Sequence, residues 1–304
     1  MKVLNFMGQR KLALGLSVVL LVLSIGSLAT RQLNWGLDFT GGTLVEVHYS
    51  ETADLSAIRG LLDGNGFAGA VVVAFGTDRD VLIRLPQGKS DADARAMLTL
   101  LQDNFEGTVE LRRTEFIGPQ VGAELREQGG LAILLALGLV MLYIAFRFQM
   151  KFAVGAVAAL FHDIVITLGF FSITGMDFDL TVLAALLAVI GYSLNDTIVV
   201  SDRIRENFRK VRGEGPVSII NISLSETLGR TLVTSLTTLL VLVALAVFGG
   251  DMIYGFAIAL LVGVVIGTYS SIYVAANTLL MLNVSKEDLM IPVKEGAEQD
   301  DLAP

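Results

Sequence analysis

The chain has 304 residues, of which 53% are hydrophobic and 17% are charged, and its mean hydropathy is +0.67. This composition excludes an ordinary soluble globular protein and is typical of a membrane protein. The formal net charge is −8, and the absence of cysteine excludes disulfide bonds.

Six apolar segments are long enough to cross a membrane, since a spanning helix needs about 20 mostly apolar residues. They occupy residues 12–30, 129–146, 152–176, 180–201, 231–250 and a long run that begins at Met252. The first is preceded by basic residues, as in a secretory signal, but it is longer than a signal core and no small-residue cleavage site follows it. We therefore expect it to be retained as span one.

Basic residues near the ends of the spans set the expected orientation. They gather in the N-terminal arm, after span two and after span four, whereas the short loops at residues 177–179 and at residue 251 carry none. Because positive residues stay in the cytoplasm, we expect a multi-pass protein with both termini on that side. Residues 1–11 then form a cytoplasmic arm and residues 286–304 an acidic cytoplasmic tail.

Residues 31–128, between spans one and two, are expected to form an external domain. They carry 15 Asp and Glu against 9 Lys and Arg, which argues against nucleic acid as a partner. The spacing predicts strand 43–49, helix 53–62, strands 71–75 and 81–85, a helix opened by a Ser90–Asp93 capping box, and strand 108–116. This order predicts a ferredoxin-like α+β domain that docks or moves; inert filler between spans is the alternative.

Residues 129–285 hold spans two to six, with a cytoplasmic connection at residues 202–229. Its first part continues span four as a charged helix, which residues 213–216 break. From Val217 onward, apolar and polar residues recur at helical spacing on opposite faces. We therefore expect an amphipathic helix on the inner membrane surface before span five.

Asp196 is a charged residue inside span four. An aspartate at the centre of a span costs about 2.5–3.5 kcal/mol on insertion scales, so it is rarely retained without a use. Tyr192 and Ser193 lie one turn earlier, and Asn195 lowers the local hydrophobicity. The carboxylate can bind and release a proton; a structural bond between two helices is the alternative.

Span five begins with Arg230, directly before a polar stripe formed by Thr231, Thr234 and Thr238. Such a stripe must face the bundle interior or a wet cavity rather than lipid. Arg230 is the only basic residue close to the stripe, which makes it a natural counter-ion for Asp196. An arginine at an inner helix end can equally extend to the lipid headgroups.

Span three contains His162 and Asp163. Adjacent helical residues point about 100° apart, so the two are not expected to face one partner jointly. With two histidines and no cysteine in the chain, no metal site is expected. Asp163 has two alternative roles, as a proton relay or in helix packing. For His162 we expect a role in packing or helix contact. In span six, Gly263, Gly267 and Ser271 form a small-residue row that predicts close helix packing.

No nucleotide-binding loop and no nucleophile with an adjacent base is found in the sequence. We therefore expect neither an enzyme nor a bound cofactor. Energy for any work must come from an ion gradient or from the ATPase of a partner.

Four segments occur in a characteristic order, and the last of them is highly specific by itself. They are WGLDFTGG at residues 35–42, EFIGPQVGAEL at 115–125, FHDIVITLG at 161–169 and GYSLNDTIVVSDRIREN at 191–207. In this order, the chain from about residue 33 to residue 280 resembles the SecF family, the smaller subunit of the bacterial SecD–SecF complex in the resistance-nodulation-division superfamily.

The resemblance implies an inner-membrane, six-span helix bundle with a periplasmic domain. It implies that the proton-motive force drives late steps of preprotein export and supports membrane-protein insertion. The implied partners are SecD, the SecYEG translocon, unfolded preproteins and membrane lipid, with YajC as a possible additional partner and no nucleic acid. Asp196 and Arg230 match the family's proton-conducting residues, which act with an aspartate of SecD.

Two other functions keep the same fold. One is half of a small-molecule exporter of this superfamily, although a self-contained exporter is expected to carry two six-helix halves. The other is a structural assembly factor of the translocon, in which Asp196 forms only a structural contact.

Overall fold

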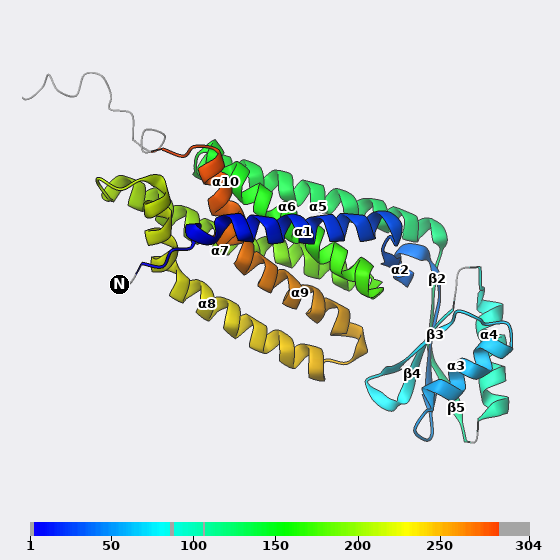
Figure 1. Ribbon diagram of the computed structural model, residues 1–304. Coiled ribbons are helices and arrows are strands. Elements are labelled where there is room, and N and C mark those ends of the chain that lie inside the picture. The colour runs from blue at the N-terminus through cyan, green and yellow to red at the C-terminus, as the bar shows by residue number, and fades with distance from the viewer. Residues whose placement is uncertain (1–2, 86–87, 106, 286–304) are drawn as a thin grey trace, which may run out of the picture.

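The computed structural model describes residues 3–85, 88–105 and 107–285. The molecule is elongated, with a bundle of long helices and a small α+β domain beyond the ends of α1 and α5 (Figure 1). The N-terminus and α10 lie at the opposite end of the bundle. The acidic tail predicted over residues 286–304 lies outside the described residues.

Six helices in the described part are long and apolar enough to cross a membrane, which confirms the predicted number. Their main segments are α1 (Arg10–Thr30), α5 (Pro119–Arg147), α6 (Met150–Thr174), α7 (Leu180–Lys210), α8 (Pro216–Phe248) and α9 (Asp251–Ser270). A 3-10 turn (Met7–Gln9) precedes α1, and a π-helical turn (Ser271–Ala275) joins α9 to α10 (Ala276–Met281). Several helices are longer than the predicted apolar segments, because the polar turns at their ends are helical too.

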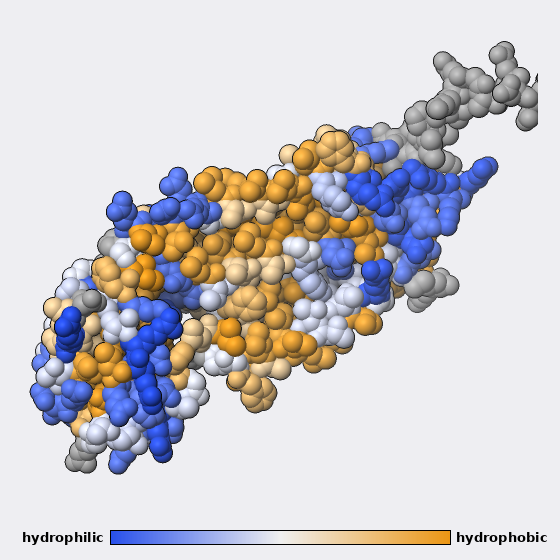
Figure 2. All heavy atoms as spheres, turned by 180° about the vertical axis from the view of Figure 1, so that it is seen from behind, coloured by the Kyte–Doolittle hydropathy of each residue, from blue (hydrophilic) through white to orange (hydrophobic). Residues whose placement is uncertain are grey.

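The centre of the bundle is formed by α6 and α7. Buried residues make up 67% and 50% of their most apolar stretches, against 11% in α5 and 17% in α8. Large apolar side chains therefore stay exposed on the outer helices, and Figure 2 shows them as a band between two polar ends. An apolar surface of this extent suits contact with lipid or with other apolar helices.

The α+β domain consists of one antiparallel sheet with two helices. Its elements are β2 (Gly42–Tyr49), α3 (Leu55–Gly64), β3 (Val71–Phe75), β4 (Thr77–Leu85), α4 (Asp91–Asn104) and β5 (Val109–Ile117). The spatial order is β3-β4-β2-β5, with every pair antiparallel. The elements occur in the predicted order, and the predicted Ser90–Asp93 capping box opens α4.

The sequence analysis missed a contact between the start of this domain and the α6–α7 loop. Here β1 (Asn34–Trp35) pairs in parallel with β6 (Asp177–Phe178), and the short helix α2 (Leu37–Thr40) follows β1. Arg84 Nη1 of β4 donates to Asp177 Oδ2 at 2.9 Å. A two-residue parallel pair has no periodicity, so only the tertiary structure reveals it.

The helix predicted after residue 216 is present. It is continuous with span five, because α8 runs without a break from Pro216 to Phe248. Its polar face is also buried, since Asn221 and Ser225 accept hydrogen bonds at 2.9 Å from the backbone N–H groups of Met7 and Leu4. The N-terminal arm covers the face that the sequence pattern assigned to water.

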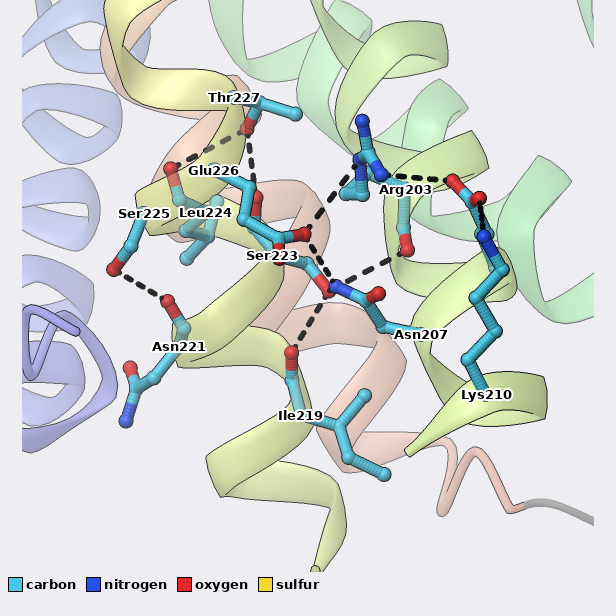
Figure 3. Close-up of polar contacts among 11 residues, drawn as sticks. Arg203, Asn207, Lys210, Ile219, Asn221, Ser223, Leu224, Ser225, Glu226 and Thr227 are labelled. Atoms are coloured by element: carbon cyan, nitrogen blue, oxygen red, sulfur yellow. Dashed lines mark hydrogen bonds and ion pairs between the residues drawn. The ribbon is translucent and has the colours of Figure 1, made fainter. Parts of the chain in front are cut away.

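A second polar network joins the end of α7 to the start of α8 (Figure 3). Asn207 Nδ2 donates to Ser223 Oγ at 3.0 Å and to Glu226 Oε2 at 2.8 Å. Arg203 contacts both Glu206 and Glu226. These contacts hold the two helices together beyond the apolar part of the bundle.

Candidate functional site

Asp196 lies on the buried side of α7 with 4% of its surface exposed. Its Oδ1 accepts one long hydrogen bond, 3.3 Å, from Thr231 Oγ1 of α8. Its Oδ2 is buried and has no hydrogen-bond partner among the described residues, as is also true of the neighbouring Thr197 Oγ1. A buried carboxylate with an unsatisfied oxygen is unfavourable, and such groups in native proteins call for an explanation.

Arg230 is exposed on α8, one residue before Thr231. It forms no ion pair with Asp196 in the described part of the chain, and its backbone carbonyl accepts a hydrogen bond from Thr234 Oγ1 at 3.0 Å. The hydrogen bond to Asp196 thus comes from Thr231 and not from the guanidinium of Arg230. The counter-ion role of Arg230 stays a prediction.

The predicted polar face around Asp196 is only partly assembled. Thr234 and Thr238 are half-buried, and each hydroxyl donates to a carbonyl of its own helix. Tyr192 donates to Ser235 Oγ at 3.1 Å, which links α7 to α8 one turn away from Asp196. Asn195 does not join them, because it precedes Asp196 by about 100° of helix turn and is exposed.

Asp163, on α6, is fully buried. Its Oδ2 accepts from Ser193 Oγ of α7 at 2.6 Å and from Ser270 Oγ of α9 at 2.7 Å. Its Oδ1 lies 2.9 Å from His162 Nδ1. Ser193 therefore bonds to Asp163 rather than belonging with Asp196, and one carboxylate joins three spanning helices.

His162 and Asp163 contact each other, contrary to the prediction that they point apart. The imidazole of His162 reaches the neighbouring carboxylate, and its ring stacks on Tyr269 with centroids 6.1 Å apart. Tyr269 OH donates to the carbonyl of Ala13 at 2.6 Å, which links α9 to α1. His162 Nε2 has no partner among the described residues.

Ser270 and Tyr269 were not among the residues predicted from the sequence. The small-residue row of span six was the signal that could have located them. An added Cβ would lie 3.0 Å from Ser193 Cβ at Gly267 and would overlap Val189 at Gly263, so α9 approaches α7 as closely as the row predicted. The residues just after Gly267 are consequently brought against α6 and α7.

The site thus contains two buried carboxylates on adjacent helices, one with three donors and one with a single long hydrogen bond. Among the described residues, no group of three His, Asp or Glu side chains gathers as a metal site. The exchangeable chemistry available here is that of protons on carboxyl, hydroxyl and imidazole groups.

Comparison with known proteins gives consistent matches along the whole chain. The family model "Protein export membrane protein SecD/SecF, C-terminal" matches residues 97–285, and the "SecD/SecF GG Motif" model matches residues 26–53. Protein translocase subunit SecF of Pseudomonas aeruginosa is 52% identical over 297 residues, covering 98% of this chain and 97% of that protein. SecF of Vibrio alginolyticus is 52% identical over 307 residues, covering 99% and 97%.

A solved structure shares the fold. The crystal structure of SecDF, a translocon-associated membrane protein from Thermus thermophilus, matches with a TM-score of 0.81 and 38% sequence identity. The match covers 93% of this chain but 39% of the SecDF chain. SecDF in its super-membrane-facing form matches with a TM-score of 0.73.

Proposed function

The chain belongs to the SecF family of protein export membrane proteins, and we propose that it couples the proton gradient to late steps of preprotein export and to membrane-protein insertion. It is an accessory subunit of the Sec translocase and a multi-pass protein of the inner membrane. In this proposal SecD supplies a second membrane half and SecYEG is the channel. The termini lie in the cytoplasm, and the α+β domain, whose strand order suits a ferredoxin-like fold, lies in the periplasm.

The incomplete bonding of Asp196 is the observation that carries the proposal. A carboxylate inside a spanning bundle is expensive, and full hydrogen bonding is the usual compensation. Asp196 has one hydrogen bond and a free Oδ2. An unoccupied oxygen of this kind is where a proton can add without breaking an existing contact.

A route from Asp196 to the α+β domain supports the coupling. Asp196 lies on α7, and the N-terminus of α7 is held by the domain side, because the Leu180 N–H donates to Asp38 Oδ2 at 3.0 Å. The preceding loop pairs with β1 and bonds to Arg84. Protonation of Asp196 would remove its charge, weaken the contact with α8 and bias α7 between two positions. Movement of α7 would then reach the domain directly.

Asp163 has a different place in this proposal. Its three donors come from α6, α7 and α9, which favours a role in holding the helices over a role as proton relay. Arg230 lies next to the residue that holds Asp196. We assign it as the cation that attracts the Asp196 carboxylate when α7 and α8 move.

The test is Asp196→Asn, which is nearly isosteric and removes the exchangeable proton. We expect normal membrane levels and normal association with SecD, but loss of the gradient-dependent part of secretory-protein release. The matched control is Asp202→Asn, which makes the same change on an exposed residue of α7 and should leave export unaffected.

Two outcomes would contradict the proposal. Normal export by Asp196→Asn at normal abundance would remove Asp196 from the proton path. Loss of the chain or of SecD from the mutant complex, with an unchanged response of the surviving complex to the gradient, would instead support the structural assembly factor.

A further inference from the structure

A hollow of about 500 Å³ lies at the end of the bundle opposite the α+β domain. It is enclosed by the start of α1, the start of α8 and the end of α10. Its walls include Arg10, Pro216, Val217, Asn277 and Met281. None of these residues takes part in the site around Asp196 and Asp163.

Two polar side chains line this hollow without partners. Arg10 is half-buried, and its guanidinium has no ion pair or hydrogen bond with any described residue. Asn277 is 8% exposed, and its amide likewise has no hydrogen bond within the described part of the chain. Both side chains border the hollow, so their donor groups are available to an external ligand.

The N-terminus of α8 is a third donor at the same place. This helix has 33 residues, and its N-cap, Gly215, offers no side-chain acceptor. Its first residue, Pro216, has no N–H, so the N–H groups of Val217 and Ser218 are the ones left without a cap. By contrast, α7 is capped by the Asp179 carboxylate, which accepts from the Val182 N–H. Free N–H groups and the helix dipole together favour an anion, and phosphate above all.

The remaining wall combines apolar side chains with Asn283 and Ser285, and two of its apolar residues are open outward. Val217 is 40% exposed and Met281 is 69% exposed. The end of the bundle opposite the α+β domain is also where the apolar band of Figure 2 gives way to hydrophilic residues. A ligand with an anionic head and an apolar tail fits these two kinds of wall.

We propose that this hollow binds the phosphate of an anionic phospholipid from the cytoplasmic leaflet. The Arg10 guanidinium and the Asn277 amide donate to the phosphate oxygens, together with the N–H groups of the first turn of α8. The acyl chains lie along Val217 and Met281. Free inorganic phosphate presents the same phosphate oxygens but has no acyl chains.

The experiment measures ligand binding to the purified full chain in detergent by native mass spectrometry and thermal shift. The probes are dioctanoyl phosphatidylglycerol, dioctanoylglycerol, which has the same chains without phosphate, and inorganic phosphate. We expect phosphatidylglycerol to bind and to raise the melting temperature, and the other two to do so far less.

Three variants locate the binding. Arg10→Gln should weaken phosphatidylglycerol binding about tenfold, because it removes a charged hydrogen bond. Asn277→Leu is similar in size and should weaken binding without lowering stability in the lipid-free protein, since its amide has no partner to lose. The control Lys11→Gln removes the same charge from the next residue, which is exposed and does not line the hollow, and should bind normally.

Several results would overturn the proposal. Equal losses in Arg10→Gln and Lys11→Gln would indicate general surface charge. If dioctanoylglycerol bound as well as phosphatidylglycerol, the hollow would not recognise phosphate. If inorganic phosphate raised the melting temperature as much as phosphatidylglycerol, the ligand would not be a lipid. The acidic residues 286–304 follow Ser285, which lines the hollow. Binding that appears only after truncation at residue 285 would identify this tail as the occupant.

Discussion

Asp163 and Asp196 lie on adjacent central helices and are buried almost equally, yet their surroundings differ. Asp163 has donors on both oxygens, from Ser193, Ser270 and His162. Asp196 has a single bond of 3.3 Å and a free Oδ2. Burial alone does not distinguish the roles of the two carboxylates, whereas their hydrogen bonds do.

The difference shows how a membrane bundle can hold one charge and leave another available. Each donor on Asp163 comes from another helix or from a side chain stacked on one, so adding a proton or moving α7 would break contacts between helices. At Asp196, the same change disturbs one weak contact. A saturated carboxylate is thus suited to fixing helix positions, and an unsaturated one to changing state.

The largest expected effect is on stability when each carboxylate is truncated. Asp163→Ala and Asp196→Ala remove the same atoms from similar depths, so cavity terms nearly cancel. We expect Asp163→Ala to lower the free energy of unfolding by about 2 kcal/mol more than Asp196→Ala, since it loses three contacts instead of one. Denaturation in mixed micelles, followed by circular dichroism, measures both. Equal losses would break the distinction between the two sites.

A smaller effect is expected when α7 and α9 are pushed apart. A methyl group at Gly267 would lie 3.0 Å from Ser193 Cβ, so Gly267→Ala should displace the serine that bonds to Asp163. We expect a loss of about 1 kcal/mol, the low end for overpacking, because the displaced side chain is a small serine. The control is Gly138→Ala on α5, where an added Cβ meets nothing within 4 Å, and it should be neutral or slightly stabilising. The same mixed-micelle measurement applies, and a neutral Gly267→Ala would show that the close approach does not position the Asp163 cluster.

The smallest effect concerns a second His–Asp pair, on the surface of the α+β domain. Asp80 accepts from Thr77 Oγ1 at 2.5 Å and lies 2.6 Å from His48 Nδ1. These contacts, the Thr77 bond first, hold the pKa of Asp80 below its ordinary value. Because the lowered pKa belongs to the folded state, the stabilisation is present above about pH 4 and is lost as the pH falls through the folded-state pKa.

Asp80→Asn tests this pair. At neutral pH it should weaken hydrogen-exchange protection in β4 by less than about 1 kcal/mol, because the half-buried pair lies at the surface, where solvent screens it. The variant and the parent chain should converge once the pH has fallen below the lowered pKa of Asp80, where its carboxyl group is protonated. A difference that persists to lower pH would show that the aspartate acts through packing rather than charge.

Much of the fold follows from local pattern. Apolar runs of spanning length give the six helices, and alternation with turn residues gives the order of the α+β domain. The Ser90–Asp93 capping box was readable because its residues are three positions apart. The close packing of α9 was readable for the same reason, from glycines four positions apart.

The tertiary structure decided which polar groups meet. Asn221 and Ser225 have the spacing of a water-exposed face, but the N-terminal arm, more than 200 residues away in sequence, covers them. Ser193 is three residues from Asp196 and bonds instead to Asp163 on another helix. Periodicity assigns a residue to a face of its own helix, within the reach of local interactions. The partner on that face depends on how distant segments pack, so the sequence alone identified the two carboxylates and only the folded bundle distinguished their bonding.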